Sequence, residues 1–414
     1  MPLARLFRGL TAAVIAALAT PAAAGAIDEF PLPPGTQPGG ITAGSDGALW
    51  FLEEGPSSIG RITTGGAVTG HFAVNAAAAP PDVSSLDQIT LGPDGNLWFT
   101  QPADDQIGRM AIPSGAVTEY NVPNTENEPE GITVGPDGAI WFTAAGVDKI
   151  GRIPVPPQAT STGGITMFPS SGAAGQGVGD IAAGPDGALW FTEGDGNRIG
   201  RITTGGAITH PGTLTAPSEP SAITAGPDGR LWFAEALAGR IAAITTGGQI
   251  NKYPGAGVDP SALAVGQDGA LWFTDSNLAA GVIGRITTGG VITDRFPVPT
   301  ANGEPSDITS GPDGALWFTE FAGNRIGRIQ TAAVFTEPSL PPLMPGSGTP
   351  AKKKACKVPR VRGLTVRKAK RKLRRAKCQH RVRGRGRVVW TKPKAGRRTT
   401  KTVRVMAKPR RPSR

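Results

Sequence analysis

A phrase built around the dipeptide Trp-Phe recurs seven times along this chain of 414 residues. Its fullest form is G-P-D-G-A-L-W-F-T-E, and I-G-R-I-T-T-G-G or a variant of it follows each copy. The tryptophans lie 40 to 49 residues apart, at Trp50, Trp98, Trp141, Trp190, Trp232, Trp272 and Trp317. A repeat of this length restricts the chain to architectures in which one small unit is copied around or along an axis.

Each unit contains four short segments that alternate like strands, typified by residues 308–311, 315–320, 326–329 and 291–298. Asp-Gly turns follow the first segment and Gly-Gly pairs follow the third, because these residues tolerate the positive φ angles of tight hairpins. The 59 glycines are therefore explained by turns rather than by disorder. Four antiparallel strands per repeat are typical of a propeller blade. The sequence predicts an all-β fold, a seven-bladed β-propeller over residues 25–340.

Two segments compete for one place in the ring. Residues 27–32 resemble a fourth strand with no blade before it, and residues 334–337 resemble another after the last blade. Joining both ends of the propeller in one blade removes free strand edges. We expect the N-terminal segment to complete the last blade, with residues 334–337 beside it or displaced.

Residues 1–24 have the features of an export signal. Arg5 and Arg8 precede a short apolar run, and three alanines at 22–24 offer a small-residue cleavage site. An N-terminal anchor is the alternative, although the apolar run is well short of the roughly 20 residues that span a bilayer. We expect a secreted, extracellular protein. Its two cysteines, Cys356 and Cys378, then indicate one disulfide.

The strand pattern also predicts where polar residues meet. In each blade the first strand should start, and the second strand should end, at the same face of the ring. The residues at the strand starts and those at the strand ends should therefore surround one mouth of the central funnel. The starts are Gly39, Asp87, Glu130, Gly179, Ser221, Ser261 and Ser306, and the ends are Glu53, Gln101, Ala144, Glu193, Glu235, Asp275 and Glu320. Asp259 and Glu304 lie two residues before the starts in the last blades.

Oxygen-rich clusters of this kind suit Mg²⁺ or Ca²⁺. The metal candidates are Asp259, Glu304 and Glu320, with Mg²⁺ as the expected cofactor and Ca²⁺ as the alternative. Solvated repeat residues that hydrogen-bond to turns are the other interpretation of these acids. No G-x-S-x-G elbow, phosphate-binding loop or Cys/His metal spacing occurs elsewhere in the chain.

The phrases G-P-D-G-x-L-W-F-T-E, N-R-I-G-R-I-T-T-G-G and E-P-S-D-I-T resemble those of the virginiamycin B lyase (streptogramin lyase) family over residues 27–340. The resemblance implies a seven-bladed propeller and a Mg²⁺-dependent carbon-oxygen lyase. Such an enzyme opens the lactone of a streptogramin B antibiotic by elimination, which confers resistance.

When the family's site residues are placed on this sequence one by one, a metal-binding glutamate is present but the histidine that acts as the catalytic base is absent. The resemblance places one metal-binding glutamate on Glu304 and a second on Glu320, the latter a looser match because loop lengths differ. It places the catalytic histidine on Ser306, a substrate-contacting histidine on Ser261 and a tyrosine on Gly39. Histidine titrates near neutral pH, whereas a serine without a partner base is a poor proton acceptor.

Three functions follow from this comparison. The first is a non-catalytic, ligand-binding family member that takes a small cyclic ester or another small ligand in its funnel. The second is an active lyase, and the third is a metal-dependent lactone hydrolase. Residues alone favour the binding protein, which we expect to be a monomer.

The C-terminal part of the chain has a different character. Residues 351–414 contain 28 Lys and Arg and no acidic residue, leaving 15 basic against 32 acidic residues in the rest. Residues 341–355 have the composition of a linker. A small α+β module follows over 356–408, with a helix expected at 365–377, strands at 387–391 and 402–406, and a basic tail at 409–414.

The order C-x-V-P-x-V-x-G-x-T, helix, cysteine, P-x-A-G and V-x-V resembles a PASTA domain, which implies binding to peptidoglycan. Its cations attract polyanions in any case, with an affinity that falls with salt. Because the chain is exported, we expect an anionic wall polymer as the partner and no specific nucleic acid. A solvated tail with no dedicated partner is the alternative.

Overall fold

The structure is a computed structural model that describes residues 25–74, 86–170, 175–254, 260–276 and 281–331, together with the strands of a C-terminal unit. The chain separates into two compact units, residues 1–336 and 337–414. The predicted export signal at 1–24, the segment 334–337, the predicted linker at 341–355, the expected helix at 365–377, Asp259 and Cys378 lie outside the described residues. Among the described residues, no helix is long and apolar enough to cross a membrane.

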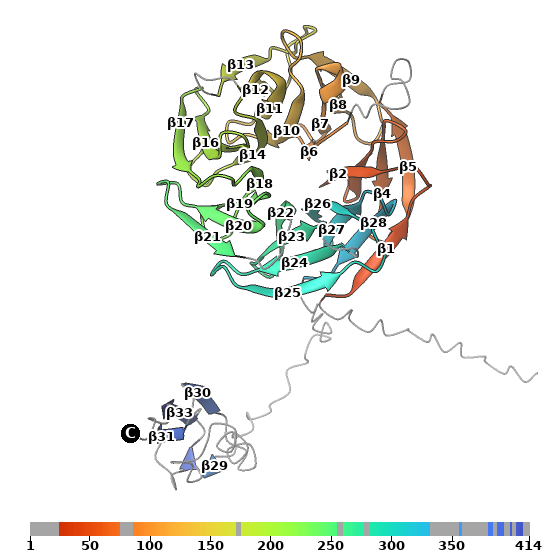
Figure 1. Ribbon diagram of the computed structural model, residues 1–414. Helices are drawn as coiled ribbons and strands as arrows, with labels where there is room; N and C mark the ends of the chain where they lie inside the picture. The colour runs from red at the N-terminus through yellow and green to blue at the C-terminus, as the bar shows by residue number, and fades with distance from the viewer. Residues whose placement is uncertain are drawn as a thin grey trace, which may run out of the picture. The chain divides into compact units, whose positions relative to one another are not determined.

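Seven four-stranded antiparallel sheets form a ring in the described part of the first unit, which confirms the predicted propeller (Figure 1). The first three blades consist of β2 (Pro38–Ala43), β3 (Leu49–Glu53), β4 (Ser58–Ile62) and β5 (Val68–Ala73); β6 (Ile89–Leu91), β7 (Leu97–Gln101), β8 (Gln106–Met110) and β9 (Val117–Asn121); and β10 (Pro129–Val134), β11 (Ile140–Ala144), β12 (Lys149–Ile153) and β13 (Thr166–Pro169). Short 3₁₀ turns, η1 (Pro102–Asp104) and η2 (Ala145–Val147), follow β7 and β11.

The next three blades consist of β14 (Val178–Ala183), β15 (Ala188–Glu193), β16 (Arg198–Thr203) and β17 (Ile208–Thr213); β18 (Pro220–Ala225), β19 (Leu231–Glu235), β20 (Arg240–Ile244) and β21 (Ile250–Pro254); and β22 (Pro260–Val265), β23 (Leu271–Asp275), β24 (Val282–Ile286) and β25 (Ile292–Pro297). The last blade combines β26 (Pro305–Ser310), β27 (Leu316–Glu320) and β28 (Arg325–Ile329) with β1 (Ile27–Pro31) from the other end of the propeller.

The N-terminal strand closes the ring, as the sequence predicts. β1 pairs with β28 from Ile27 opposite Ile329 to Pro31 opposite Arg325. Phe30 of β1 stacks on Trp317 of the last blade, with ring centroids 5.4 Å apart. Because this blade contains strands from both ends of the propeller, it leaves no unpaired fourth position.

The repeated Asp, Trp and Arg residues form the same contact in six of the seven blades. In the first blade, Trp50 Nε1 donates a hydrogen bond to Asp46 Oδ1 at 3.1 Å, and Arg61 Nε donates to Asp46 Oδ2 at 2.7 Å. The fifth blade carries Ala243 where the others carry this arginine, and Arg230 pairs with its turn aspartate instead. The turn aspartate therefore links the first hairpin to the third strand in six of the seven blades.

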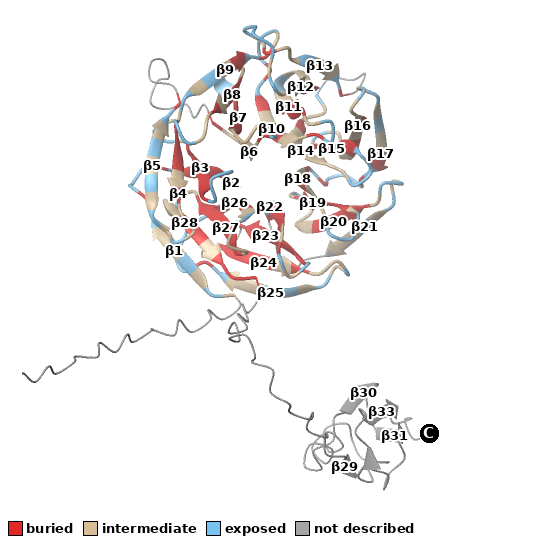
Figure 2. Ribbon diagram, turned by 180° about the vertical axis from the view of Figure 1, so that it is seen from behind, coloured by how far each residue is buried: buried red, intermediate tan, exposed pale blue. Residues whose placement is uncertain are grey.

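The core of the propeller lies between blades. Each buried tryptophan packs against the inner strands of a neighbouring blade, and seven apolar clusters fill the seven junctions among the described residues. The second strand of the first blade is buried throughout, whereas its outer strand alternates between half-buried and exposed residues (Figure 2). Burial between blades is therefore what holds the ring together without a disulfide in the described propeller.

Strands of the C-terminal unit are β29 (Cys356–Lys357), β30 (His380–Arg383), β31 (Arg387–Lys392), β32 (Arg398–Thr399) and β33 (Val403–Lys408). β33 pairs antiparallel with β31 and parallel with β30, and β29 pairs with β32. The two strands expected at 387–391 and 402–406 are therefore present and neighbouring.

Candidate functional site

A β-bulge at the start of the first strand shapes the centre of the ring. In the first blade the pairing of β2 with β3 shifts register between Pro38 and Ile41, and five other blades shift at the corresponding place. A bulge takes residues off the regular ladder and changes the direction of their side chains. Two consecutive residues of a blade can therefore both face the axis.

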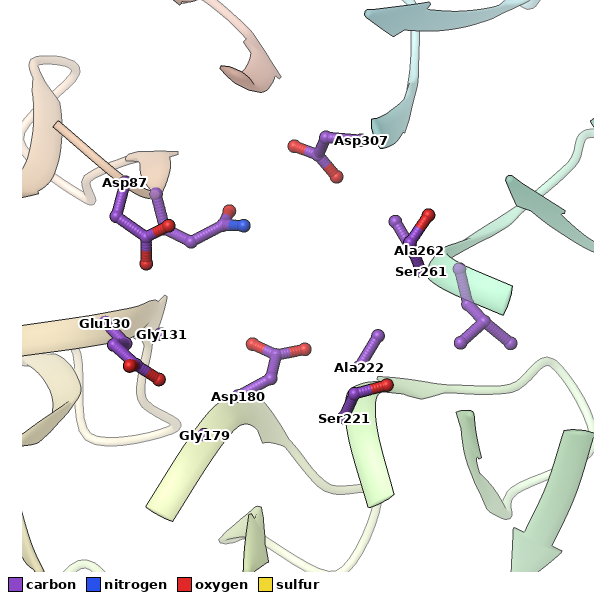
Figure 3. A pocket seen from close by; sticks show the side chains of 12 residues that line it. Asp87, Glu130, Gly131, Gly179, Asp180, Ser221, Ala222, Ser261, Ala262 and Asp307 are labelled. Atoms are coloured by element: carbon purple, nitrogen blue, oxygen red, sulfur yellow. The ribbon is translucent and has the colours of Figure 1, made fainter. Parts of the chain in front are cut away.

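A pocket of about 240 Å³ lies where these bulges meet, and first strands of neighbouring blades line it (Figure 3). The predicted strand starts Asp87, Glu130, Ser221 and Ser261 are among its lining residues. Asp180 and Asp307, which the strand pattern did not predict, also line it and point toward the axis (Figure 3). The described pocket has four carboxyl groups in its lining and no Lys or Arg.

Asp180 and Asp307 also connect neighbouring blades. The Asp180 carboxyl accepts hydrogen bonds from the backbone N–H of Ile181 and from that of Ile223 in the next blade, both at 2.7 Å. Asp307 accepts from Ile308 in the same way and from Ile41 of the first blade at 2.8 Å. The second of these carboxyls therefore joins the last blade to the first.

Burial raises the pKa of every carboxyl group in this pocket. The pKa values of Asp87 and Asp307 rise to about 6, and those of Glu130 and Asp180 rise to about 7. Removal from water is the main cause in each case, and the negative charges of neighbouring acids add to it for Glu130, Asp180 and Asp307. The pocket is thus partly protonated near neutral pH and gains negative charge when a cation enters.

The serines at the family's histidine positions are tied to the scaffold. Ser306 Oγ lies 2.8 Å from Thr319 Oγ1, and Ser261 Oγ lies 2.8 Å from Thr274 Oγ1. Thr274 Oγ1 also donates to the Ser306 carbonyl at 3.1 Å, so these hydroxyls belong to the contact between blades. Ser261 lines the pocket, whereas Ser306 is not among the described lining residues. Among the described residues, no Lys, Arg or His forms a hydrogen bond with the Ser306 hydroxyl.

The predicted strand ends lie inside the blades rather than around the funnel. Glu53, Glu193 and Glu235 are buried and contact the third and fourth strands of their own blades. Burial alone would raise the pKa of Glu235. Hydrogen bonds from Arg240 and Ser218 nevertheless hold this pKa below its ordinary value.

Glu320 differs from its counterparts because it faces another acid. Burial, together with the carboxyl of Glu29 on β1, raises the pKa of Glu320 to about 8. Arg325, which occupies the position of Arg240, lies 3.8 Å from Glu29 instead. Glu320 is therefore largely neutral near neutral pH.

The residues that the resemblance assigns to Mg²⁺ fit that ion poorly here. A hard cation requires several carboxylates that converge on one point, whereas Glu320 is buried beside Glu29 and Glu304 is exposed. Among the described residues, no group of three His, Cys, Asp or Glu is arranged to hold a metal ion. At Gly39, the Glu54 carboxyl occupies the space that a larger side chain would take. Metal binding at Asp259, Glu304 and Glu320 stays a prediction.

The virginiamycin B lyase family model matches residues 11–169, 78–254 and 157–345, and the PASTA domain model matches residues 357–405. The selenomethionine-substituted virginiamycin B lyase from Staphylococcus aureus is 34% identical, with 74% of this chain and 99% of that chain covered and a TM-score of 0.65. A structure described as streptogramin B lyase is also 34% identical, with 74% and 97% covered and a TM-score of 0.66.

More distant structures share the fold alone. Hydrazine synthase from Kuenenia stuttgartiensis is 18% identical, with 72% of this chain and 96% of that chain covered and a TM-score of 0.55. The comparison with curated proteins found no match.

Proposed function

From the premise that this chain belongs to the virginiamycin B lyase family, we propose that it is an exported, ligand-binding member that does not open streptogramin lactones. Its ligand is a small organic cation held in the central pocket. The observation that carries this proposal is the lining of that pocket, which has four carboxyl groups and no basic side chain among the described residues.

Charge and size both support a small cation. The pocket volume of about 240 Å³ suits a short amine better than a macrocyclic antibiotic. A positive group near Asp87, Asp180 and Asp307 would recover the cost of ionising carboxyls whose pKa values burial has raised. Binding near neutral pH should therefore release protons from the pocket.

The binding test uses calorimetry with 1,4-diaminobutane as the probe and 1,4-butanediol as its uncharged counterpart. We expect the diamine to bind with a heat that depends on the buffer, because protons are released, and the diol not to bind. Asp307→Asn should weaken binding about tenfold or more, as expected when a charged partner is lost. Equal binding of the two probes, or no binding of either, would contradict the proposal.

The catalytic test uses the streptogramin B compound quinupristin with Mg²⁺ and mass spectrometry of the product. We expect no turnover, because Ser306 and Ser261 are bound to scaffold threonines and general-base catalysis typically supplies about 10²–10⁴-fold. Ser306→His combined with Ser261→His should raise the rate if the pocket still admits the substrate. A ring opened without a change of mass would identify a lyase, and a gain of one water a lactone hydrolase.

One observation favours the lyase as a second candidate. Glu130 lines the central pocket with a pKa raised to about 7 by burial and by neighbouring acids, which is the range suited to a general base. If the unmodified protein does turn over quinupristin, Glu130→Gln should abolish that activity, whereas Glu119→Gln on β9 should not.

We further propose that the C-terminal unit holds the protein at the cell wall. Support comes from the PASTA match at residues 357–405 and from the 28 Lys and Arg at 351–414. The full chain should sediment with peptidoglycan sacculi, and a chain ending at residue 336 should stay in solution. Salt should weaken an interaction with anionic wall polymers steeply. Equal sedimentation of both chains would exclude this role.

A further inference from the structure

A second pocket lies on the first blade, away from the residues that line the central one. Its volume is about 400 Å³, within the range of small-molecule sites. The lining combines Pro33, Pro34 and Pro56 with Glu53, Ser58 and His71. Neither the proposed cation site nor the family's assigned positions use any of these side chains.

A buried carboxyl group orients the polar end of this pocket. Glu53 is 2% exposed and lies 2.7 Å from His71 Nδ1, whereas the His71 side chain is 47% exposed. Ser58 Oγ donates to the other oxygen of Glu53 at 2.5 Å. Both carboxyl oxygens are thus occupied from within the blade. When the imidazole is neutral, Nδ1–H donates to Glu53 and Nε2 keeps a lone pair for a ligand.

Comparison between blades shows why a pocket exists here. In the fourth and fifth blades the position of Ser58 is occupied by Arg198 and Arg240, and each arginine pairs with the buried glutamate of its own blade. The fourth blade also has a histidine, His210, opposite that glutamate, but its ring packs edge-on against Phe191. The short side chain of Ser58 leaves unfilled the space that arginine takes elsewhere.

Backbone contacts hold the walls of the pocket in place. Gly55 N–H donates to the Thr36 carbonyl at 3.2 Å, and Thr36 Oγ1 donates to the Pro33 carbonyl at 2.6 Å. A Cβ on Gly55 would lie 1.9 Å from the Gly35 carbonyl oxygen, so only glycine permits this approach. The two loops that carry the prolines are therefore fixed against each other before any ligand arrives.

We propose that this pocket binds a flat, neutral ring that carries one O–H or N–H donor, of the phenol class. The proline rings provide apolar faces for an aromatic ring, and His71 Nε2 accepts the donor. An anionic ligand is disfavoured because the buried Glu53 carboxyl already supplies the acidic group at this end.

The test follows the histidine Cε1–H signals by NMR while phenol is added to the full chain. The sequence has three histidines, and His71→Gln assigns the signal that matters. The measurement is made in mildly alkaline buffer, which favours neutral imidazole. Phenol should shift the His71 signal in a saturable way and leave that of His210 unchanged.

Two matched comparisons decide the proposal. Anisole has the same ring without the donor and should bind about tenfold more weakly, as expected for a lost hydrogen bond. Ser58→Arg copies the fourth and fifth blades and should abolish the shift at His71. Equal affinity for phenol and anisole, equal shifts at His71 and His210, or undiminished binding by Ser58→Arg would each overturn it. The first two outcomes do not depend on Ser58→Arg, so they hold even if that variant does not fold.

Discussion

Replacing Asp180 by asparagine should change how the stability of the propeller depends on pH. In the folded protein, burial raises the pKa of this carboxyl from 3.8 to about 7. The folded state therefore holds a proton that the unfolded chain has already released. Because the folded state binds more protons between these two values, the free energy of unfolding falls as pH rises through that interval.

The size of the effect follows from the same pKa. Between pH 5 and pH 8, a carboxyl that titrates at about 7 in the fold and at 3.8 in the unfolded chain loses about 3 kcal/mol of stability. Asp180 borders the pocket, where solvent weakens the penalty. We therefore expect this residue to lower the free energy of unfolding by about 2 kcal/mol between pH 5 and pH 8. The asparagine side chain does not titrate and contributes none of this loss.

Asparagine has its own cost, which does not vary with pH. The two carboxyl oxygens of Asp180 accept hydrogen bonds from the backbone N–H groups of Ile181 and Ile223. An amide has only one oxygen that can accept, so the substitution loses one of these bonds and lowers the free energy of unfolding by about 1–3 kcal/mol. Urea denaturation at pH 5 should thus show the variant to be less stable than the wild type. At pH 8 the difference should be about 2 kcal/mol smaller, or reversed.

Asp294→Asn, at an exposed position of the outer strand β25, serves as the matched control for the Asp-to-Asn substitution itself. A constant difference between Asp180→Asn and the wild type from pH 5 to pH 8 would refute the reasoning. It would show that solvent and neighbouring groups keep the carboxyl ionised in the folded protein.

Three further predictions concern the blades. Glu320→Gln should change the melting temperature little near neutral pH because that carboxyl is protonated, whereas Glu235→Gln should destabilise by about 2 kcal/mol because it breaks a buried pair with arginine. Chemical denaturation of Arg230→Ala should show a loss of about 1 kcal/mol, and adding Ala243→Arg, which restores the arginine of the other blades, should recover it. Phe30→Ala should lower the free energy of unfolding by about 2 kcal/mol, because this half-buried ring stacks on Trp317 where β1 closes the last blade. Unfolding monitored by tryptophan fluorescence should show this loss, and an unchanged midpoint would mean that β1 adds little to ring closure.

Much of the fold could be predicted because its determinants are local and repeated. The Asp-Gly turns, the buried Trp-Phe strands and the short third strands occur in every unit, so each copy supports the interpretation of the others. The structure places the first strand of the last blade at Pro305–Ser310, whereas the repeat segment by itself indicates residues 308–311. That difference of three residues includes the bulge, which breaks the alternation from which strands are recognised.

The candidate site was predicted only in part, for the same reason. Strict alternation makes Asp87 and Glu130 face the funnel and turns the following residue of each blade away from it. The bulge also brings the following residue to the axis, so Asp180 and Asp307 were missed although they line the pocket. The signal available in the sequence was an aspartate immediately before the first-strand isoleucine, as at Ile181 and Ile308.

The sequence by itself determined the number of blades, their four strands and the use of the N-terminal strand to close the ring, because turn chemistry and apolar periodicity act within each repeat. Only the tertiary structure decided what each acid contacts. Glu235 meets an arginine from its own blade, whereas the equivalent Glu320 meets Glu29, which enters the last blade from the opposite end of the propeller. A partner brought in by ring closure leaves no mark in the repeat, yet after burial it is the next cause that raises the pKa of Glu320.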